Sequence, residues 1–88
     1  AKEFSLSQNY PNPFNPNTKI NFSIPKGDYV SLRVYDMLGR EVNVLVNGQL
    51  SAGEYEVDFN AKGLSSGMYY YSLRAGEYVD VKKMVLLK

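Results

Sequence analysis

Apolar side chains occupy every second position in a series of short runs, and this period most constrains how the chain can fold. The clearest runs extend from Ile20 to Ile24 and from Val30 to Val34, with polar side chains between the apolar ones. Residues two apart share one face of a β-strand, whereas a helix would place them on different faces. Helical periodicity is absent from the chain. The sequence therefore predicts an all-β fold.

Further runs show the same alternation and are separated by turn-forming segments. Their apolar members are Phe4 and Leu6; Val42, Val44 and Val46; Tyr55, Val57 and Phe59; Tyr69, Tyr71 and Leu73; and a last run from about Tyr78 to Leu87. The breaks are "PKGD", "DMLGR" with Gly39 at positive φ, "NGQ", "AKGLSSG" and "AGE". Strands at spacings of roughly 8–12 residues are typical of antiparallel sandwiches. We therefore predict an immunoglobulin-like antiparallel β-sandwich of about seven strands, with the apolar set buried between its sheets.

The segment "SSGMYYY", Ser65 to Tyr71, resembles the start of a strand that carries a tyrosine corner. In that motif the Tyr hydroxyl caps the preceding loop while the ring packs inside. Tyr69 is the candidate. Tyr71 stands where antibody domains have a cysteine, so we expect apolar packing to replace the disulfide.

The segment "NYPNPFNPNTKI" precedes the second strand and combines prolines with asparagines. Its prolines are Pro11, Pro13 and Pro16. Proline fixes φ and disfavours helix in the residue before it, while asparagine caps turns. We expect an ordered strap, with Tyr10 and Phe14 as apolar anchors over the open end of the sandwich.

The length of 88 residues allows one domain. We assign residues 1–17 to the first strand and strap and residues 18–88 to the main sandwich. The chain starts at Ala1 without methionine, so we expect a piece of a longer protein, and "KMVLLK" to be a genuine C-terminus.

The composition excludes several classes of function. The chain has no cysteine or histidine, so no thiolate or imidazole can act as a nucleophile, metal ligand or proton shuttle. The net charge of +1, with scattered lysines and arginines, gives no basic face for nucleic acid. We predict no enzyme, no catalytic residues and no cofactor or metal site.

Two sets of acidic residues could serve either function or structure: one could be catalytic and the other could bind a metal ion. Glu54, Glu56 and Asp58 share one strand face, and glycosidases use paired carboxylates. A strand of so small a sandwich offers no cleft, so we favour a solvated outer face. Asp28 or Asp36 could join strap carbonyls around calcium, but turn-forming asparagines explain the same residues.

An exposed aromatic platform would suit sugar stacking. Its candidates are Tyr29, Tyr35, Tyr70 and Tyr78. The alternative function is thus an accessory carbohydrate-binding or spacer module of a multidomain secreted hydrolase, with polysaccharide as partner.

In "KMVLLK" the residues from Met84 to Leu87 are apolar without alternation, so an unprotected strand end could be a template for an added strand. Packing on the sandwich, with lysines as gatekeepers, is the favoured account.

Five motifs occur in order along the chain. They are "LSQNYPNPFNPNTKINFSIP", "VYDMLGREV", "LSAGEYEVDF", "LSSGMYYYSL" and "KMVLLK". From Leu6 to Lys88 they closely resemble the type A C-terminal sorting domain of the type IX secretion system. This family is similar to the immunoglobulin-like domain of the flagellar hook-cap scaffold protein, in agreement with the predicted sandwich. Phe59 departs from many relatives, which have Trp, and this changes the volume of the core.

The resemblance implies a non-catalytic signal that directs a cargo protein through the outer-membrane translocon of type IX secretion. Such domains end secreted hydrolases, adhesins and other cargo of certain Gram-negative bacteria. The cargo crosses the periplasm and is then released or attached to the cell surface. The implied partners are the translocon, a sortase-like peptidase that removes the domain, and the upstream cargo domain, with no small-molecule substrate.

The resemblance also implies which residues are recognised. In this family the terminal strand carries much of the recognition, and the Gly-x-Tyr motif corresponds to Gly67 and Tyr69. The matching terminal residues are Gly76, Lys82, Lys83, Met84, Val85, Leu86, Leu87 and Lys88. We expect a receptor to read the folded sandwich together with this strand.

Overall fold

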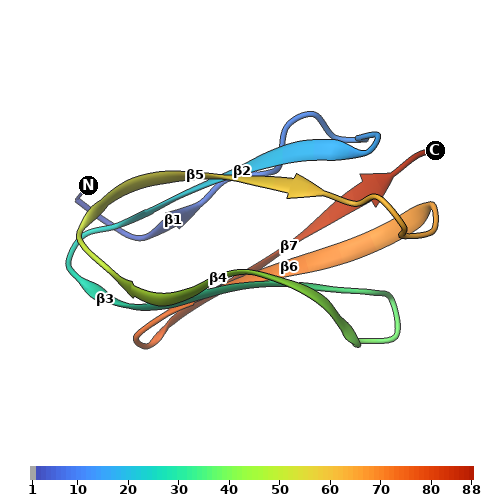
Figure 1. Ribbon diagram of the computed structural model, residues 1–88. Coiled ribbons are helices and arrows are strands. Elements are labelled where there is room, and N and C mark those ends of the chain that lie inside the picture. Colours follow the sequence, from blue (N-terminus) through green and yellow to red (C-terminus); the bar gives the residue numbers. More distant parts are fainter. Residues whose placement is uncertain (1) are drawn as a thin grey trace.

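The computed structural model describes residues 2–88 and contains seven β-strands (Figure 1). They are β1 Ser5–Leu6, β2 Asn17–Ile24, β3 Asp28–Tyr35, β4 Glu41–Leu50, β5 Gly53–Asn60, β6 Gly67–Ala75 and β7 Tyr78–Leu86. One antiparallel sheet has the order β1-β2-β5 and the other the order β4-β3-β6-β7. The predicted all-β sandwich is confirmed. In residues 2–88 we find no helix with the length and apolar character needed to cross a membrane.

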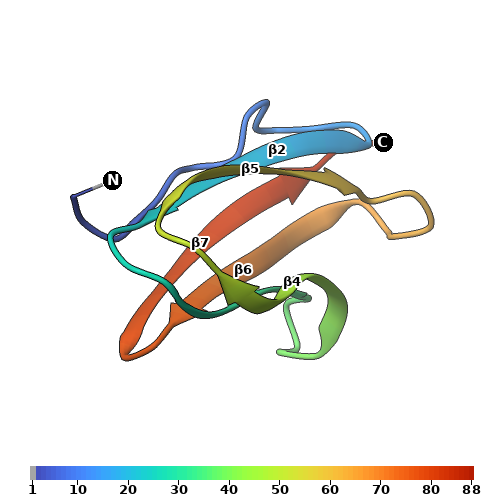
Figure 2. The ribbon, with the colours of Figure 1, turned by 60° about the vertical axis from the view of Figure 1, so that its left-hand side comes forward.

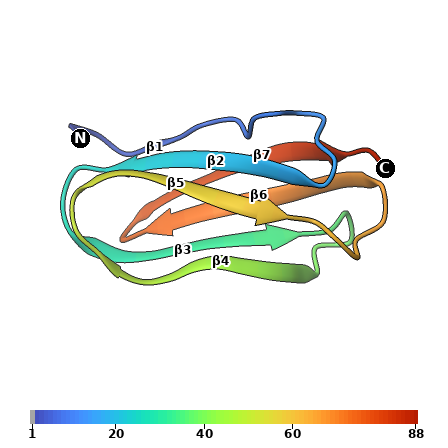
Figure 3. The same cartoon turned by 45° about the horizontal axis from the view of Figure 1, so that its top comes forward.

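The two sheets lie as layers one over the other (Figures 2 and 3). The side chains of their inner faces form the core. In β2 the burial alternates strictly, so that Thr18, Ile20, Phe22 and Ile24 point inward. Strands β3 and β6 contribute the same period from the opposite sheet. The core residues are Leu6, Phe14, Ile20, Phe22, Ile24, Val30, Leu32, Val34, Phe59, Ala61, Tyr69, Tyr71, Leu73, Ala75, Met84 and Leu86. The two-residue period thus gives both the strands and most of the buried set.

Strand β4 departs from the prediction in two ways. It continues through the predicted "NGQ" turn, because Asn47 and Gly48 pair with β3, and the chain reverses only after Leu50. The register between β3 and β4 also shifts, so that Leu45 is an extra residue between the pairs Leu32↔Val46 and Arg33↔Val44. A bulge of this kind reverses which side chains face inward. Val44 is therefore 38% exposed, and its predicted place in the core was wrong.

Candidate functional site

The terminal strand β7 lies at one edge of its sheet, with alternating inner and outer side chains. Met84 and Leu86 point inward and are fully buried. Val85 is half-buried on the other face, and Leu87, just beyond the strand, is 53% exposed. The run is part of the core on one side and presents side chains to solvent on the other.

The strap covers the backbone edge of β7 at its C-terminal end. The Phe14 N–H donates to the Val85 carbonyl at 3.0 Å, and the Leu87 N–H donates to the Phe14 carbonyl at 3.0 Å. The Val85 N–H donates to Asn12 Oδ1 at 3.0 Å, and Gln8 Nε2 donates to the Lys83 carbonyl. These are the groups that an edge strand would otherwise offer to another chain. The end of β7 is thus already paired, and it is not the unprotected template considered above.

Only one of the two predicted apolar anchors of the strap is buried. Phe14 is 2% exposed, and its ring lies 6.0 Å from the ring of Phe59. Tyr10 is 81% exposed, so its predicted role as an anchor was wrong. The backbone of Tyr10 exchanges two hydrogen bonds with Lys19, which extends the chain there. Neighbouring side chains of an extended chain point to opposite sides, and the inward position belongs to Asn9, which is 2% exposed.

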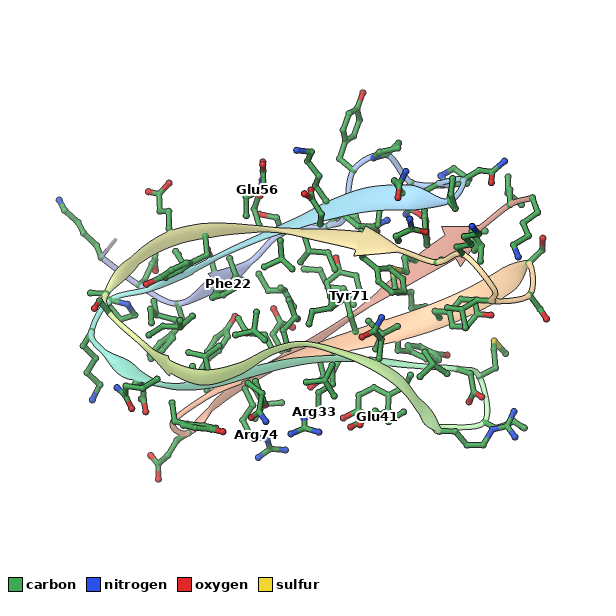
Figure 4. The ribbon with its side chains drawn as sticks, viewed as in Figure 1. Phe22, Arg33, Glu41, Glu56, Tyr71 and Arg74 are labelled. Carbon is green, nitrogen blue, oxygen red and sulfur yellow. The ribbon has the colours of Figure 1, made fainter. Side chains whose placement is uncertain are left out.

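A buried polar network holds the strap to both sheets, and sequence reasoning missed it. The Tyr71 hydroxyl donates to the Ser7 carbonyl at 2.7 Å and accepts the Asn9 N–H at 2.8 Å. Asn9 Nδ2 donates to Thr18 Oγ1 at 3.0 Å, and Thr18 Oγ1 donates to the Pro11 carbonyl at 2.9 Å. Burial raises the pKa of Tyr71 to about 12. Tyr71, which lies between the sheets (Figure 4), therefore replaces the antibody disulfide by hydrogen bonds as well as by apolar packing.

The loop between β5 and β6 holds the last residue of the chain. The Tyr69 hydroxyl donates to the Ser65 carbonyl at 2.7 Å, which is the contact expected of a tyrosine corner. The ring of Tyr69 is buried, and Tyr69 in β6 lies opposite Met84 in β7. Gly67, at φ 148°, lies opposite Leu86. The Lys88 N–H donates to Ser66 Oγ at 3.1 Å.

The remaining predicted site residues lie at two opposite ends of the sandwich. Pro16 accepts the Ala61 N–H through its carbonyl at 2.9 Å, whereas Pro13 is exposed. Lys82 is half-buried, and Lys83 is exposed. Gly76 lies in the turn between β6 and β7, which is at the opposite end of the sandwich from the C-terminus (Figure 1). The structure thus joins the strap, Gly67, Tyr69 and the end of β7, but it does not bring Gly76 to them.

The outer faces of the two sheets carry exposed ion pairs. The three carboxylates of β5 face solvent, as predicted, and Lys19 Nζ lies 3.2 Å from Glu56 and 3.5 Å from Asp58. Hydrogen bonding to Glu56 is the main reason that the pKa of Lys19 is raised. On the other sheet Arg33 lies 2.8 Å from Glu41 (Figure 4). Within residues 2–88 no group of three or more acidic side chains could hold a metal ion.

The proposed tyrosine platform is not one surface. Tyr29, Tyr35 and Tyr70 belong to the outer face of the β4-β3-β6-β7 sheet, where Tyr35 and Tyr70 lie opposite one another. Tyr78 instead stacks on Phe4, with ring centroids 4.8 Å apart, so its predicted membership was wrong. The divided tyrosines give little support to a sugar-binding face.

The chain matches a family model described as a secretion system C-terminal sorting domain over residues 8–87. Among solved structures it is similar to PorZ, an essential bacterial surface component of the type-IX secretion system of Porphyromonas gingivalis. The TM-score is 0.64 and the identity 20%, and the match covers 100% of this chain and 12% of that one. A Pseudomonas fluorescens alkylpurine DNA glycosylase, AlkC, matches with a TM-score of 0.51 and 12% identity, over 98% of this chain and 31% of that one. At these identities the two structures show a shared fold alone. No curated protein matches the chain.

Proposed function

Because the chain belongs to the secretion system C-terminal sorting domain family, we propose that its folded sandwich is the address by which a cargo protein is recognised. The family serves type IX secretion, and its cargo is secreted or attached to the cell surface. The domain interacts with the type IX machinery. The chain spans 12% of the length of PorZ. The cargo protein that carries this domain is therefore assigned only as part of the proposal.

The position of the terminal strand carries this proposal. Met84 and Leu86 are buried in the core, and the strap pairs with the backbone beside them. A receptor therefore meets this strand as one surface of a folded domain. The surface consists of the outward side chains Lys83, Leu87 and Lys88 together with the exposed part of the strap.

We assign the finer steps as follows. The domain acts as one unit over residues 1–88, follows an upstream cargo domain, and crosses the periplasm with it. It is then bound by the outer-membrane translocon and removed by a sortase-like peptidase. The domain itself carries out no covalent chemistry. The hydroxyls of Tyr69 and Tyr71 are bonded to backbone carbonyls, Glu56 forms an ion pair with Lys19, and no histidine or cysteine is present in the sequence.

The test separates recognition of the terminal strand from stability of the fold. Deleting "KMVLLK" would also remove Met84 and Leu86 from the core, so surface variants are the better probes. Residues 1–88 are fused behind a periplasmically exported reporter in a type IX-competent host, and the reporter outside the cell is measured. Leu87→Ser combined with Lys88→Glu is expected to reduce export.

Val81→Ser is the matched control, because Val81 and Leu87 are both 53% exposed and lie at or next to the same strand. This control is expected to export like the unchanged domain. Full export of the Leu87 and Lys88 variant would show that these terminal side chains are not recognised. Absence of export of the unchanged domain would contradict the sorting function itself.

A further inference from the structure

The turn between β3 and β4 presents two apolar side chains to solvent. Met37 is 62% exposed and Leu38 is 77% exposed, which makes them the most exposed large aliphatic side chains of residues 2–88. Neither belongs to the core or to the apolar side chains packed against it. Turns of the commonest type favour Asp at the first position and Gly at the fourth, as Asp36 and Gly39 stand here, and accept most residues between them. The turn therefore does not require large apolar side chains at Met37 and Leu38.

The turn is held rigidly without help from either apolar side chain. Asp36 Oδ1 accepts the N–H groups of Leu38 and Arg40 at 2.9 Å each, and Asp36 Oδ2 accepts Arg40 Nε at 2.8 Å. Backbone bonds join Asp36 N–H to the Arg40 carbonyl and Gly39 N–H to the Asp36 carbonyl. Gly39 supplies the positive φ of 83° that closes the turn. The tip is thus preorganised, and this lowers the entropic cost of binding.

The tip borders the surface that contains the end of the terminal strand. A groove of about 260 Å³ separates Met37 and Leu38 from the start of β6, and its far wall includes Ser66 and Met68. Met68 is itself 37% exposed, and Ser66 is the residue that holds the Lys88 N–H. In Figure 1 the β3–β4 turn, the β5–β6 loop and the C-terminus all lie at the end opposite the N-terminus. The apolar tip and the terminal strand therefore flank one loop and can be covered by one partner.

We propose that Met37 and Leu38 form an anchor that inserts into an apolar pocket of a protein of the secretion machinery. The proposal rests on the sorting function above and names a second contact of the same recognition surface. Methionine adapts its shape to a partner's pocket, and a rigid apolar anchor at an interface carries a large share of its affinity. The rim of the partner's pocket would fill the groove beside Met68.

Two other occupants fit the tip less well. A lipid surface is held by apolar residues combined with a basic cluster, whereas the turn has only Arg40, which is paired with Asp36. A second copy of the chain, meeting tip to tip, would bury two side chains from each molecule. That is far below the area of roughly 1,000 Å² that a stable interface needs.

The same reporter-export assay, in which the reporter outside the cell is measured, tests the anchor formed by Met37 and Leu38. Met37→Ser with Leu38→Ser is expected to lower reporter export about tenfold or more, the effect of losing a main anchor. Val79→Ser with Val81→Ser, at side chains that are 46% and 53% exposed on β7, is the matched control. The control is expected to stay within about twofold, as for ordinary surface changes. Leu38→Met, which keeps an apolar side chain, is expected to export normally.

Export of the Met37 and Leu38 double variant at the level of the unchanged domain would overturn the anchor while leaving the sorting function intact. An equal loss in the control variant would also overturn it, since the effect would then not belong to the tip. Sedimentation of the purified domain and flotation with vesicles of phosphatidylethanolamine and phosphatidylglycerol test the other occupants. Self-association or vesicle binding that Leu38→Ser abolishes would replace the protein pocket by that partner.

Discussion

Replacing Tyr71 by phenylalanine removes one oxygen and two hydrogen bonds from the interior. The ring stays in place, so packing changes little, but the Ser7 carbonyl and the Asn9 N–H lose their buried partner. Each lost bond with an unsatisfied buried group costs about 1–1.5 kcal/mol, so we expect a loss of about 2–3 kcal/mol. A chain of this length has a total free energy of unfolding of about 4–13 kcal/mol. The change is therefore large for a single atom.

Tyr69→Phe is the natural control, because that hydroxyl makes a single bond, to the Ser65 carbonyl. It should cost about 1 kcal/mol. Thermal unfolding followed by far-UV circular dichroism should show the melting temperature of Tyr71→Phe lowered by about 10–20 °C. A loss no greater than that of Tyr69→Phe would refute the view that the Tyr71 hydroxyl holds the strap.

The ionisation of Tyr71 gives a second measurement of the same contact. Burial raises its pKa from the ordinary 10.0 to about 12, so the folded state favours the neutral hydroxyl. This contribution to stability is complete below pH 10 and is lost as the pH rises from 10 to about 12, by about 2–3 kcal/mol. Urea unfolding at pH 8, 10 and 11.5 should therefore show the gap between the unchanged chain and Tyr71→Phe narrowing above pH 10. A constant gap would contradict the raised pKa.

Four further substitutions test other parts of the structure. Phe14→Ala should lower the free energy of unfolding by about 3–5 kcal/mol and Tyr10→Ala by less than about 0.5 kcal/mol in urea titrations, because only Phe14 is buried. Similar losses for the two would contradict this assignment. Gly76→Ala should cost about 1–2 kcal/mol in the same assay, since Gly76 has φ +60° and an added Cβ would contact the Asp28 carboxylate; an unchanged stability would show that this turn relaxes. For Asp36 the Arg40 N–H is the main cause of a lowered pKa, so its stabilisation is present above the ordinary value of 3.8 and is lost as the pH falls below it. Asp36→Asn should therefore flatten the acid side of the stability profile between pH 5 and 2, and an unaltered acid side would refute the lowered pKa.

The sequence predicts the strands well where one face of a strand is buried and the other is solvated. Strands β2, β3 and β6 follow that rule, so their alternation alone identified the inner faces. Strand β4 does not, because the extra residue Leu45 changes the facing of its neighbours. A bulge depends on pairing with another strand, which the local pattern of Val42 to Val46 does not encode. The pair Asn47-Gly48 suggested a turn by the same local logic, but cross-strand pairing kept it extended.

The strap shows a different limit of sequence reasoning. Tyr10 and Phe14 were both expected to be buried anchors because both are large and aromatic. Only Phe14 is buried. The inward position went to Asn9, whose amide and backbone have partners in Thr18 and Tyr71. Polar burial depends on matched partners that are distant in the sequence, and no local pattern reveals them. The same reason explains why Tyr71 was expected to contribute packing alone.

The burial of the terminal strand also restricts how it can be recognised. Pulling its end away from the sandwich would expose Met84, Leu86 and Phe14, at about 1.5–3 kcal/mol for each side chain. The sum, about 5–9 kcal/mol, approaches the whole free energy of unfolding of a chain of this size. A receptor that needed a detached strand would have to supply that free energy before making its first contact, whereas Leu87 and the Met37–Leu38 tip are accessible on the folded domain. Changes at Tyr71 should therefore affect export only as far as they unfold the domain, while changes at Leu87 or Leu38 should affect it at an unchanged melting temperature.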